Sequence, residues 1–138
     1  MVRQLSIFLQ NEAGKIAAIT RTLASADINI RALTIADTAD FGILRMLVSD
    51  VDRATKVLAE KGYMAKATEV TVVAVPDQPG GLAEVLDVMA EGSIDIEYMY
   101  SYLGRDSRSA YMIFRSGDEA ALAALLAEHG IAVVDPEL

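Results

Sequence analysis

An internal repeat is the sequence feature that most restricts the fold of this chain. Residues 11–16 recur at 77–82, and residues 28–30 recur at 94–96, in both cases 66 positions later. The 138 residues, of which 53% are hydrophobic, are enough to bury a real core. One repeat alone is near the lower limit for an independent domain. We therefore expect two copies of one small fold that pack together.

The pattern of apolar and turn-forming residues predicts the same order of elements in both copies, which we place at 1–68 and 69–138. In the first copy we expect strands at 5–9, 28–36, 41–49 and 63–67, a helix with Ile16, Ile19 and Leu23 on one face, and a second helix that Asp52 caps and Gly62 ends. In the second copy we expect strands at 70–75, 94–103, 109–115 and 131–134, and helices at 80–91 and 118–128. Each copy thus has the order β-α-β-β-α-β.

With right-handed crossovers, this order predicts a four-stranded antiparallel sheet with two helices on one face, a ferredoxin-like α+β fold. The second strand of each copy, 28–36 or 94–103, would be a long apolar edge that aggregates if left bare. We expect these two edges to pair side by side and form one eight-stranded antiparallel sheet with four helices on one face. The runs 43–48 and 72–75 are apolar on both sides of their strands, which indicates that the other face is covered as well. A second copy of the molecule is the simplest cover, so we predict a homodimer stacked through its sheets.

Charge and composition exclude several classes of partner. The net charge is −8, from 20 acidic and 12 basic residues, and the basic residues are scattered, so phosphate backbones would be repelled and no nucleic acid is expected. We see no apolar segment long enough for a signal peptide or a membrane span. Cysteine is absent, which excludes disulfides and thiolate metal sites. We expect a cytoplasmic protein without a cofactor, a metal or a membrane partner.

The repeated segments resemble those of ACT domains, small regulatory modules that bind amino acids in enzymes and regulators of amino-acid metabolism. The likeness is carried by Asn11-x-x-Gly14-x-Ile16 with Ile28-Asn29-Ile30, and by Asp77-x-Pro79-Gly80-x-Leu82 with Ile94-Asp95-Ile96. Two such loops at one offset are much more specific than one, and the likeness covers nearly the whole chain. The runs 36–45 and 96–101 are similar to those of stand-alone tandem ACT proteins. The resemblance therefore implies two ACT repeats that bind a free amino acid.

The two loops have the chemistry that an amino-acid carboxylate needs. Gly14-Lys15-Ile16 and Gly80-Gly81-Leu82 each open a helix, where unpaired N–H groups and the helix dipole favour an anion. The resemblance implies that a loop residue and a residue before the second strand also contact the ligand. These positions are Asn11 and Asn29 in the first copy and Asp77 and Asp95 in the second. The alternative is that these four residues only form caps and turns.

The two copies differ in the side chains of the second strand. Tyr98, Tyr100 and Tyr102 share one face, whereas the equivalent residues in the first copy are Ala32, Thr34 and Ala36. If these strands are neighbours, tyrosines meet small residues, and the pocket of the first copy becomes suited to one aromatic or ring-bearing amino acid. The alternative is that the tyrosines only fill the boundary between the copies. The predicted ligand-binding residues are Asn11, Ala13, Gly14, Lys15, Ile16, Asn29, Leu33, Asp77, Pro79, Gly80, Gly81, Leu82, Asp95, Tyr98, Met99 and Tyr100.

The preferred function is an amino-acid sensor or regulatory protein that holds its ligand at the interface of the two repeats and acts on a partner enzyme. The alternative is a regulatory or interaction subunit of a biosynthetic enzyme that binds no ligand. Catalysis is not expected, because the chain has no nucleophile and base pair, nucleotide motif or metal cluster. A hydrolase similar to acylphosphatases would also need an arginine in the loop, where Asn-Glu-Ala-Gly and Asp-Gln-Pro-Gly stand instead. The one histidine, His129, suits the end of a helix better than a metal site.

Overall fold

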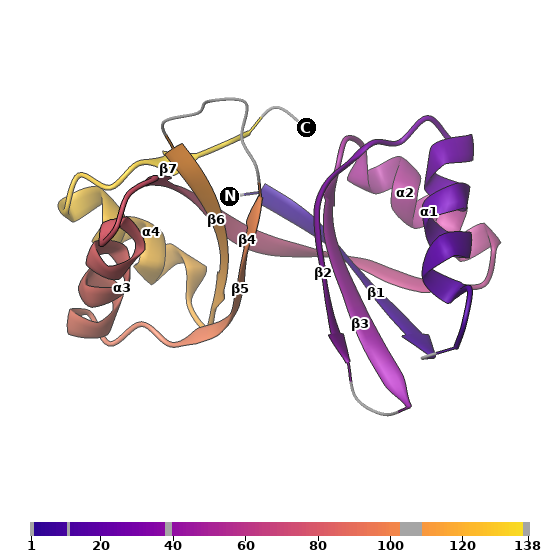
Figure 1. The fold of residues 1–138 in the computed structure, drawn as a ribbon, viewed down its shortest axis with the longest axis horizontal. Coiled ribbons are helices and arrows are strands. Elements are labelled where there is room, and N and C mark those ends of the chain that lie inside the picture. Colours follow the sequence, from indigo (N-terminus) through magenta and orange to yellow (C-terminus); the bar gives the residue numbers. More distant parts are fainter. Residues whose placement is uncertain (1, 11, 38–39, 103–108, 137–138) are drawn as a thin grey trace. The chain divides into compact units, whose positions relative to one another are not determined.

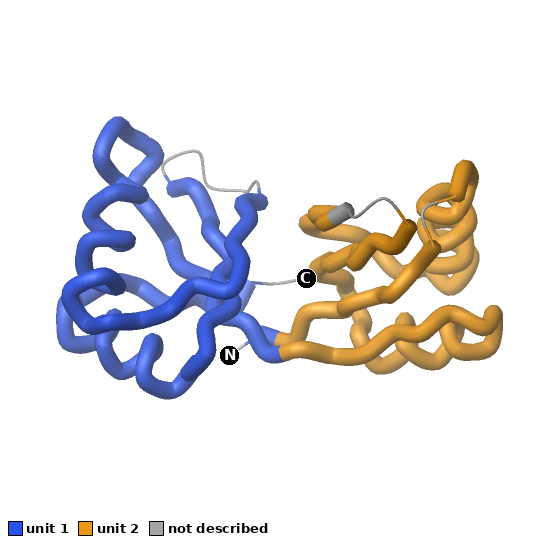
Figure 2. The backbone as a smooth tube through the Cα atoms, turned by 90° about the horizontal axis from the view of Figure 1, so that it is seen from below, with its two compact units in different colours: residues 1–2, 69–136 blue, residues 3–68, 137–138 orange. Residues whose placement is uncertain are grey.

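The chain divides into two compact units, each of which holds one β-α-β-β-α-β repeat (Figures 1 and 2). The computed structural model describes residues 2–10, 12–37, 40–102 and 109–136. The N-terminal unit spans Arg3–Thr68, and the C-terminal unit spans Glu69–Pro136 together with Val2.

The order of helices and strands agrees with the order predicted from the sequence. The N-terminal unit contains β1 (Val2–Gln10), α1 (Lys15–Ser25), β2 (Ile30–Asp37), β3 (Phe41–Val48), α2 (Val51–Glu60) and the first part of β4 (Met64–Pro76). The C-terminal unit contains the rest of β4, α3 (Gly81–Glu91), β5 (Ile96–Tyr102), β6 (Ser109–Ser116), α4 (Glu119–Glu128) and β7 (Val133–Val134). Residues 103–108, where the predicted strand 94–103 ends and 109–115 begins, lie outside the described residues.

The long strand β4 changes the predicted sheet. Its 13 residues replace two predicted strands, 63–67 and 70–75. The described residues therefore form a sheet of seven strands, and the prediction of eight was wrong. No glycine or proline stands between Met64 and Val75, so nothing turns the extended backbone between the repeats. The strand order is β2-β3-β1-β4-β6-β5, with β7 beside β4.

The predicted pairing of the two edge strands was also wrong. In the described part of the chain, β2 pairs with β3, β5 pairs with β6, and both stand at the ends of the strand order. Because β4 belongs to both repeats, the hydrogen-bonded ladder continues through it without edge pairing.

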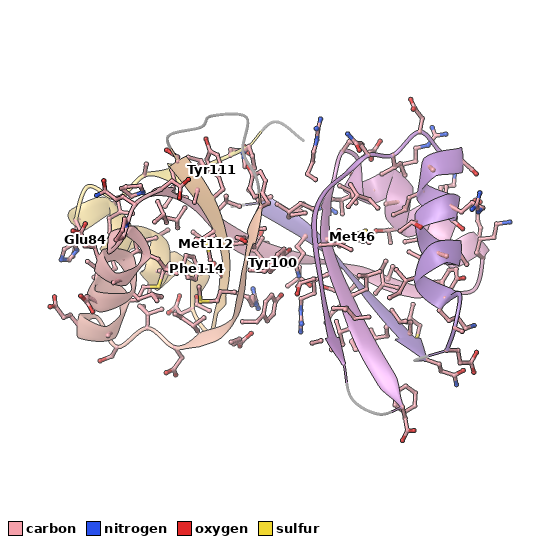
Figure 3. All side chains as sticks on the ribbon, in the orientation of Figure 1. Met46, Glu84, Tyr100, Tyr111, Met112 and Phe114 are labelled. Atoms are coloured by element: carbon pink, nitrogen blue, oxygen red, sulfur yellow. The ribbon has the colours of Figure 1, made fainter. Side chains whose placement is uncertain are left out.

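In each unit, both helices pack on the same face of the strands (Figure 1). The core of the N-terminal unit joins Ile19 and Leu23 of α1 and Leu58 of α2 to Ile7 and Met46 of the sheet. The core of the C-terminal unit joins side chains of α3 and α4 to the sheet in the same way, and Phe114 points toward these helices from β6 (Figure 3). Its buried members are Val73, Val75, Val85, Met89, Phe114, Leu122 and Leu126.

The sheet face away from the helices is also buried at many positions. Leu47, Val72 and Ile113 have no exposed surface, although their neighbours along the strand point to the helices. Gln4 and Ser6 are buried there too, where the Gln4 amide donates a 3.0 Å hydrogen bond to Ser6 Oγ. These positions are therefore buried, as the apolar runs 43–48 and 72–75 indicated, and the homodimer stays a prediction.

Two details at the helix starts differ from the sequence prediction. Asp50, not Asp52, caps α2, because its carboxylate accepts a 3.0 Å hydrogen bond from the Arg53 N–H. Asp52 lies in the first turn, where the hydrogen bond from Arg3 lowers the pKa of its carboxyl group. Ile16 was predicted to face the core with Ile19, but it remains 39% exposed in the first turn of α1.

Asp50→Ala is expected to lower the free energy of unfolding by about 1 kcal/mol, because it leaves an N–H group of α2 without its cap. Asp52→Ala is expected to lower the free energy of unfolding by less, because both side chains of the ion pair between Arg3 and Asp52 are exposed. Urea unfolding of the two variants measures both values. The pKa of Asp52 is lowered from its ordinary value of 3.8, so the pair with Arg3 contributes fully to the free energy of unfolding above pH 3.8. This contribution is lost as the pH falls through the lowered pKa. An equal loss in the two variants at neutral pH would contradict the assignment of the cap.

Candidate functional site

Two equivalent glycines start the first helix of each unit. Gly14 precedes α1 with φ +84°, and Gly80 precedes α3 with φ +87°, a conformation that glycine adopts without strain. Within the described residues, no side chain caps either helix, whereas Asp50 and Asp118 cap α2 and α4. Among the described residues, the starts of α1 and α3 therefore lack the carboxylate cap that α2 and α4 have. The first N–H of each helix donates to a loop carbonyl oxygen, that of Lys15 to Glu12 at 3.3 Å and that of Gly81 to Gln78 at 3.1 Å, and the N–H groups that follow can bind an anion.

The loop of the N-terminal unit is the more favourable of the two for a carboxylate. Lys15 opens α1 and is partly exposed, with its Nζ 3.9 Å from a carboxylate oxygen of Glu12. The first turn of α1 has no acidic residue, whereas the first turn of α3 contains Glu84. A carboxylate near the start of a helix competes with an anionic ligand for the same positive end of the dipole. The first turn of α1 therefore contains a cation and that of α3 a carboxylate, although Glu12 balances part of the charge of Lys15.

In the C-terminal loop, two predicted site residues have packing roles. Gly81 is buried, and an added Cβ would overlap the carbonyl oxygen of Pro76. Leu82 packs against the core beneath α3. Asp77 and Pro79 are exposed. In the N-terminal loop, Ala13, Gly14 and Ile16 are exposed, and Asn11 lies outside the described residues.

Within one unit, the glycine loop and the predicted residue before the second strand do not come together. Gln10, at the end of β1, pairs with Phe41, whereas Ile30, which follows Asn29, pairs with Val48 at the other end of β3. These ends are seven residues apart on the strand, or about 23 Å at the usual rise. The Asn29 N–H donates a 2.9 Å hydrogen bond to Ser49 Oγ, so its backbone closes a turn there.

The same separation holds in the C-terminal unit. Asp95 precedes β5, and its carbonyl oxygen accepts a 3.4 Å hydrogen bond from Gly117 after β6. Gly80, in contrast, follows the end of β4 that pairs with the start of β6. The loop residues and Asp95 of this unit therefore lie at opposite ends of its strands.

The residues predicted from the second strands divide between two faces. Tyr98 and Tyr100 pair with Arg115 and Ile113 and lie on the face away from α3 and α4, where Figure 3 labels Tyr100. Met99 lies on the other face and packs against the core beneath the helices. Leu33 pairs with Met46, so it shares the helix side of its unit, and it is 51% exposed. Met99 and the tyrosines are thus not on one surface.

A pocket that the sequence did not indicate lies beside Lys15 in the N-terminal unit. It has a volume of about 440 Å³ at the end of β1 and the starts of β3 and β4. Phe41 and Met64 in its wall are 63% and 72% exposed, so the pocket presents large apolar side chains to solvent. Its lining residues are Phe8, Leu9, Gln10, Lys15, Phe41, Lys61, Gly62, Tyr63 and Met64.

The pocket combines aromatic walls with two cations, Lys15 and Lys61. This composition suits a small molecule with a negative group and an apolar or aromatic part. The residues in the sequence that could have indicated this pocket are Phe8 and Phe41, which lie on the strand face away from the helix-covered core. Their closeness follows from the pairing of Gln10 with Phe41, which single-strand patterns do not reveal.

Two further features of the described ranges concern metal ligands and the length of the helices. No group of three or more His, Asp or Glu residues there is arranged to hold a metal ion. His129 ends α4, and its Nδ1 lies 3.0 Å from the carbonyl oxygen of Leu125 in the preceding turn. Of the described helices, none is both long and apolar enough to cross a bilayer.

Comparison with known proteins agrees with the duplicated fold. The model of the ACT domain pair family matches residues 1–135. The crystal structure of protein BT0572 from Bacteroides thetaiotaomicron is similar to this chain, with 38% identity and a TM-score of 0.90, over 96% of this chain and 91% of that chain. No curated protein matches the chain.

Two more distant structures share the fold. The regulatory subunit of aspartate kinase from Thermus thermophilus, in its ligand-free form, has 20% identity and a TM-score of 0.64 over 93% of this chain and 91% of that chain. E. coli aspartokinase III in complex with lysine and aspartate has 16% identity and a TM-score of 0.53, over 93% of this chain and 31% of that chain. Because the family model spans both units, the chain belongs to the ACT family and consists of an ACT domain pair.

Proposed function

We propose that this protein is a regulatory protein of amino-acid metabolism that binds a free amino acid. The match of an ACT domain pair to residues 1–135 carries this proposal, since almost the whole chain is accounted for by these domains. The structure of aspartokinase III with lysine and aspartate adds support, because a protein that contains this fold is seen there with amino acids.

The N-terminal unit offers the chemistry for such a ligand. The start of α1 has no side-chain cap within the described residues, and Lys15 adds a positive charge beside it, so both favour the α-carboxylate. The adjoining pocket then offers Phe8, Phe41 and Tyr63 as a wall for an apolar or aromatic side chain. A role for Asn11, Asn29, Tyr98 and Tyr100 at the interface of the repeats remains a prediction from the sequence.

Thermal melting against each of the twenty amino acids at millimolar concentration tests the proposal. A ligand that binds only the folded state stabilises it by roughly 2.7 kcal/mol at a hundredfold excess over its Kd. We expect a selective rise in Tm with one amino acid or a few related ones, most of all those with apolar or aromatic side chains. A Tm that none of the twenty changes would overturn the proposal.

Lys15→Ala is expected to weaken binding of the stabilising amino acid about tenfold, because it removes the cation beside the carboxylate. The matched control is Lys56→Ala, which removes an exposed lysine from α2 that does not line the pocket. Isothermal titration calorimetry compares the two variants with the parent protein. Equal affinity in Lys15→Ala and Lys56→Ala would place the carboxylate elsewhere.

The alternative function is a regulatory subunit that binds a biosynthetic enzyme without a small ligand. The likeness to the regulatory subunit of aspartate kinase from T. thermophilus favours it, because that protein matches this chain over 91% of its own length. Capture of a specific enzyme by the purified protein, together with an unchanged Tm in the amino-acid screen, would support this alternative. A homodimer and a cytoplasmic location remain part of the proposal in both cases.

A further inference from the structure

A second hollow of the N-terminal unit lies between α1 and α2 and has a basic lining. Its volume is about 520 Å³. Three cations line it, and Glu60 is the one acidic residue among its lining residues. The lining residues are Ala18, Arg21, Thr22, Ser25, Ala26, Arg53, Val57, Glu60 and Lys61. In a chain of net charge −8, this gathering of cations on one surface is unexpected. We call this surface the basic groove.

The equivalent surface of the C-terminal unit has the opposite charge. Positions on α1 and α3 correspond at an offset of 66, so Ala18, Arg21 and Ser25 become Glu84, Asp87 and Glu91. These three acidic residues are three or four positions apart, so they share one exposed face of α3. Glu84 points away from the sheet in Figure 3. We call Glu84, Asp87, Glu91 and the exposed Glu128 of α4 the acidic face.

No basic residue reduces the charge of the acidic face from within its own helices. Neither α3 nor α4 contains lysine or arginine. Conversely, α1 contains Lys15 and Arg21 and no acidic residue. Among the described residues, the ion pairs involve neither the cations of the basic groove nor the carboxylates of the acidic face. Both surfaces therefore have charges available for a partner.

The two surfaces also differ in relief. Small side chains at Ala18, Ser25 and Ala26 leave the space between α1 and α2 open. At the position of Ala26, the C-terminal unit has Gly92, and an added Cβ there would overlap the side chain of Leu125. Leu125, which replaces Val57 at an offset of 68, thus fills the space between α3 and α4. A hollow basic surface and a filled acidic surface complement each other.

We propose that the basic groove of one copy of this chain docks on the acidic face of a second copy. The chain itself supplies both complementary surfaces, which makes a second copy the partner that the charges fit best. This surface is formed by helices, so it differs from the sheet face through which the sequence predicted a stacked homodimer.

Charge reversal tests the proposal on the full chain. We expect the parent protein to sediment as a dimer or larger assembly at micromolar concentration. The double variants Arg21→Glu/Arg53→Glu and Asp87→Arg/Glu91→Arg are each expected to associate at least tenfold more weakly, because like charges then meet. An equimolar mixture of the two variants should restore association, since every contact between unlike copies again joins opposite charges.

Single variants supply the control for net charge. Arg53→Glu and Lys56→Glu each replace a cation of α2 by a carboxylate, so they change the net charge of the protein equally. Of these two residues, Arg53 lines the basic groove and Lys56 does not. We expect Arg53→Glu to weaken association and Lys56→Glu to leave it unchanged, with circular dichroism confirming that both fold. Three results would each overturn the proposal. The parent protein could be monomeric, the two single variants could associate equally, or the mixture of the double variants could fail to associate. An acidic partner protein that binds the groove of a monomeric parent would be one such outcome.

Discussion

Gly81→Ala is expected to lower the free energy of unfolding by about 3 kcal/mol, a large effect for a single added methyl group. Gly81 is buried at the start of α3, and its Cβ would lie far inside van der Waals contact with the carbonyl oxygen of Pro76 and 3.2 Å from the carbonyl carbon. These atoms belong to the backbone at the end of β4, so they cannot turn aside as a flexible side chain would. Either α3 moves outward or β4 bends, and both changes disturb the packing of Val85 against the sheet.

Gly117→Ala is the matched control for this substitution. Gly117 is exposed, its φ is not in the left-handed region, and an added Cβ would meet nothing within 4 Å. We expect its stability to remain within about 0.5 kcal/mol of the parent protein. Urea unfolding followed by circular dichroism measures both variants. If the two prove equally stable, α3 does not approach β4 as closely as the structure places it.

Glu119→Ala is the second substitution with a large expected effect, again about 3 kcal/mol. Glu119 begins α4 and is only 8% exposed. Its carboxylate accepts hydrogen bonds from the Thr71 hydroxyl of β4 and, at 2.7 Å, from the Ser116 N–H. The Arg115 guanidinium lies 3.9 Å away and balances part of its charge. Alanine would leave the Thr71 hydroxyl and the Ser116 N–H buried without this acceptor, which costs more than the loss of one hydrogen bond.

A double-mutant cycle separates this network from a general effect on α4. Thr71→Val removes the hydroxyl donor and nearly preserves the shape of the side chain. We expect the double variant Thr71→Val/Glu119→Ala to be at least about 1 kcal/mol more stable than the sum of the single effects indicates. Glu128→Ala, which removes an exposed carboxylate from the same helix, should cost less than about 0.5 kcal/mol. Strict additivity in the cycle would mean that the two side chains do not interact.

The order of the elements could be predicted because it depends on local physics. Gly14 and Gly80 recur because both loops need a left-handed residue before a helix, and this need is visible in the sequence as a repeated glycine. Apolar side chains such as Ile19, Leu23 and Leu58 occur at helical spacing, so the buried faces of α1 and α2 were also foreseeable. Duplication doubled this signal, since each local pattern was present twice at one offset.

The start of α2 shows where local signals became ambiguous. Asp50 and Asp52 are both acceptable caps by residue type, and only the hydrogen bond to the Arg53 N–H distinguishes them. The break predicted between residues 67 and 70 failed for a related reason. Both runs favour a strand, and whether one strand continues into the next depends on the partners on either side, which are β1 in one unit and β6 and β7 in the other.

The sequence by itself determined the duplication, the α+β class, the family and the two glycine loops that start helices, because these features depend on residue types at short spacing. The tertiary structure alone decided which of these residues meet. Strand pairing placed Asn29 at the far end of β3 from the glycine loop, and it brought Phe41 beside Lys15 and Tyr63 in one pocket. It also gathered Arg21 and Arg53, from two different helices, into one groove. These contacts depend on the register and packing of segments that are far apart in the chain. A pattern within a single segment contains no information about them.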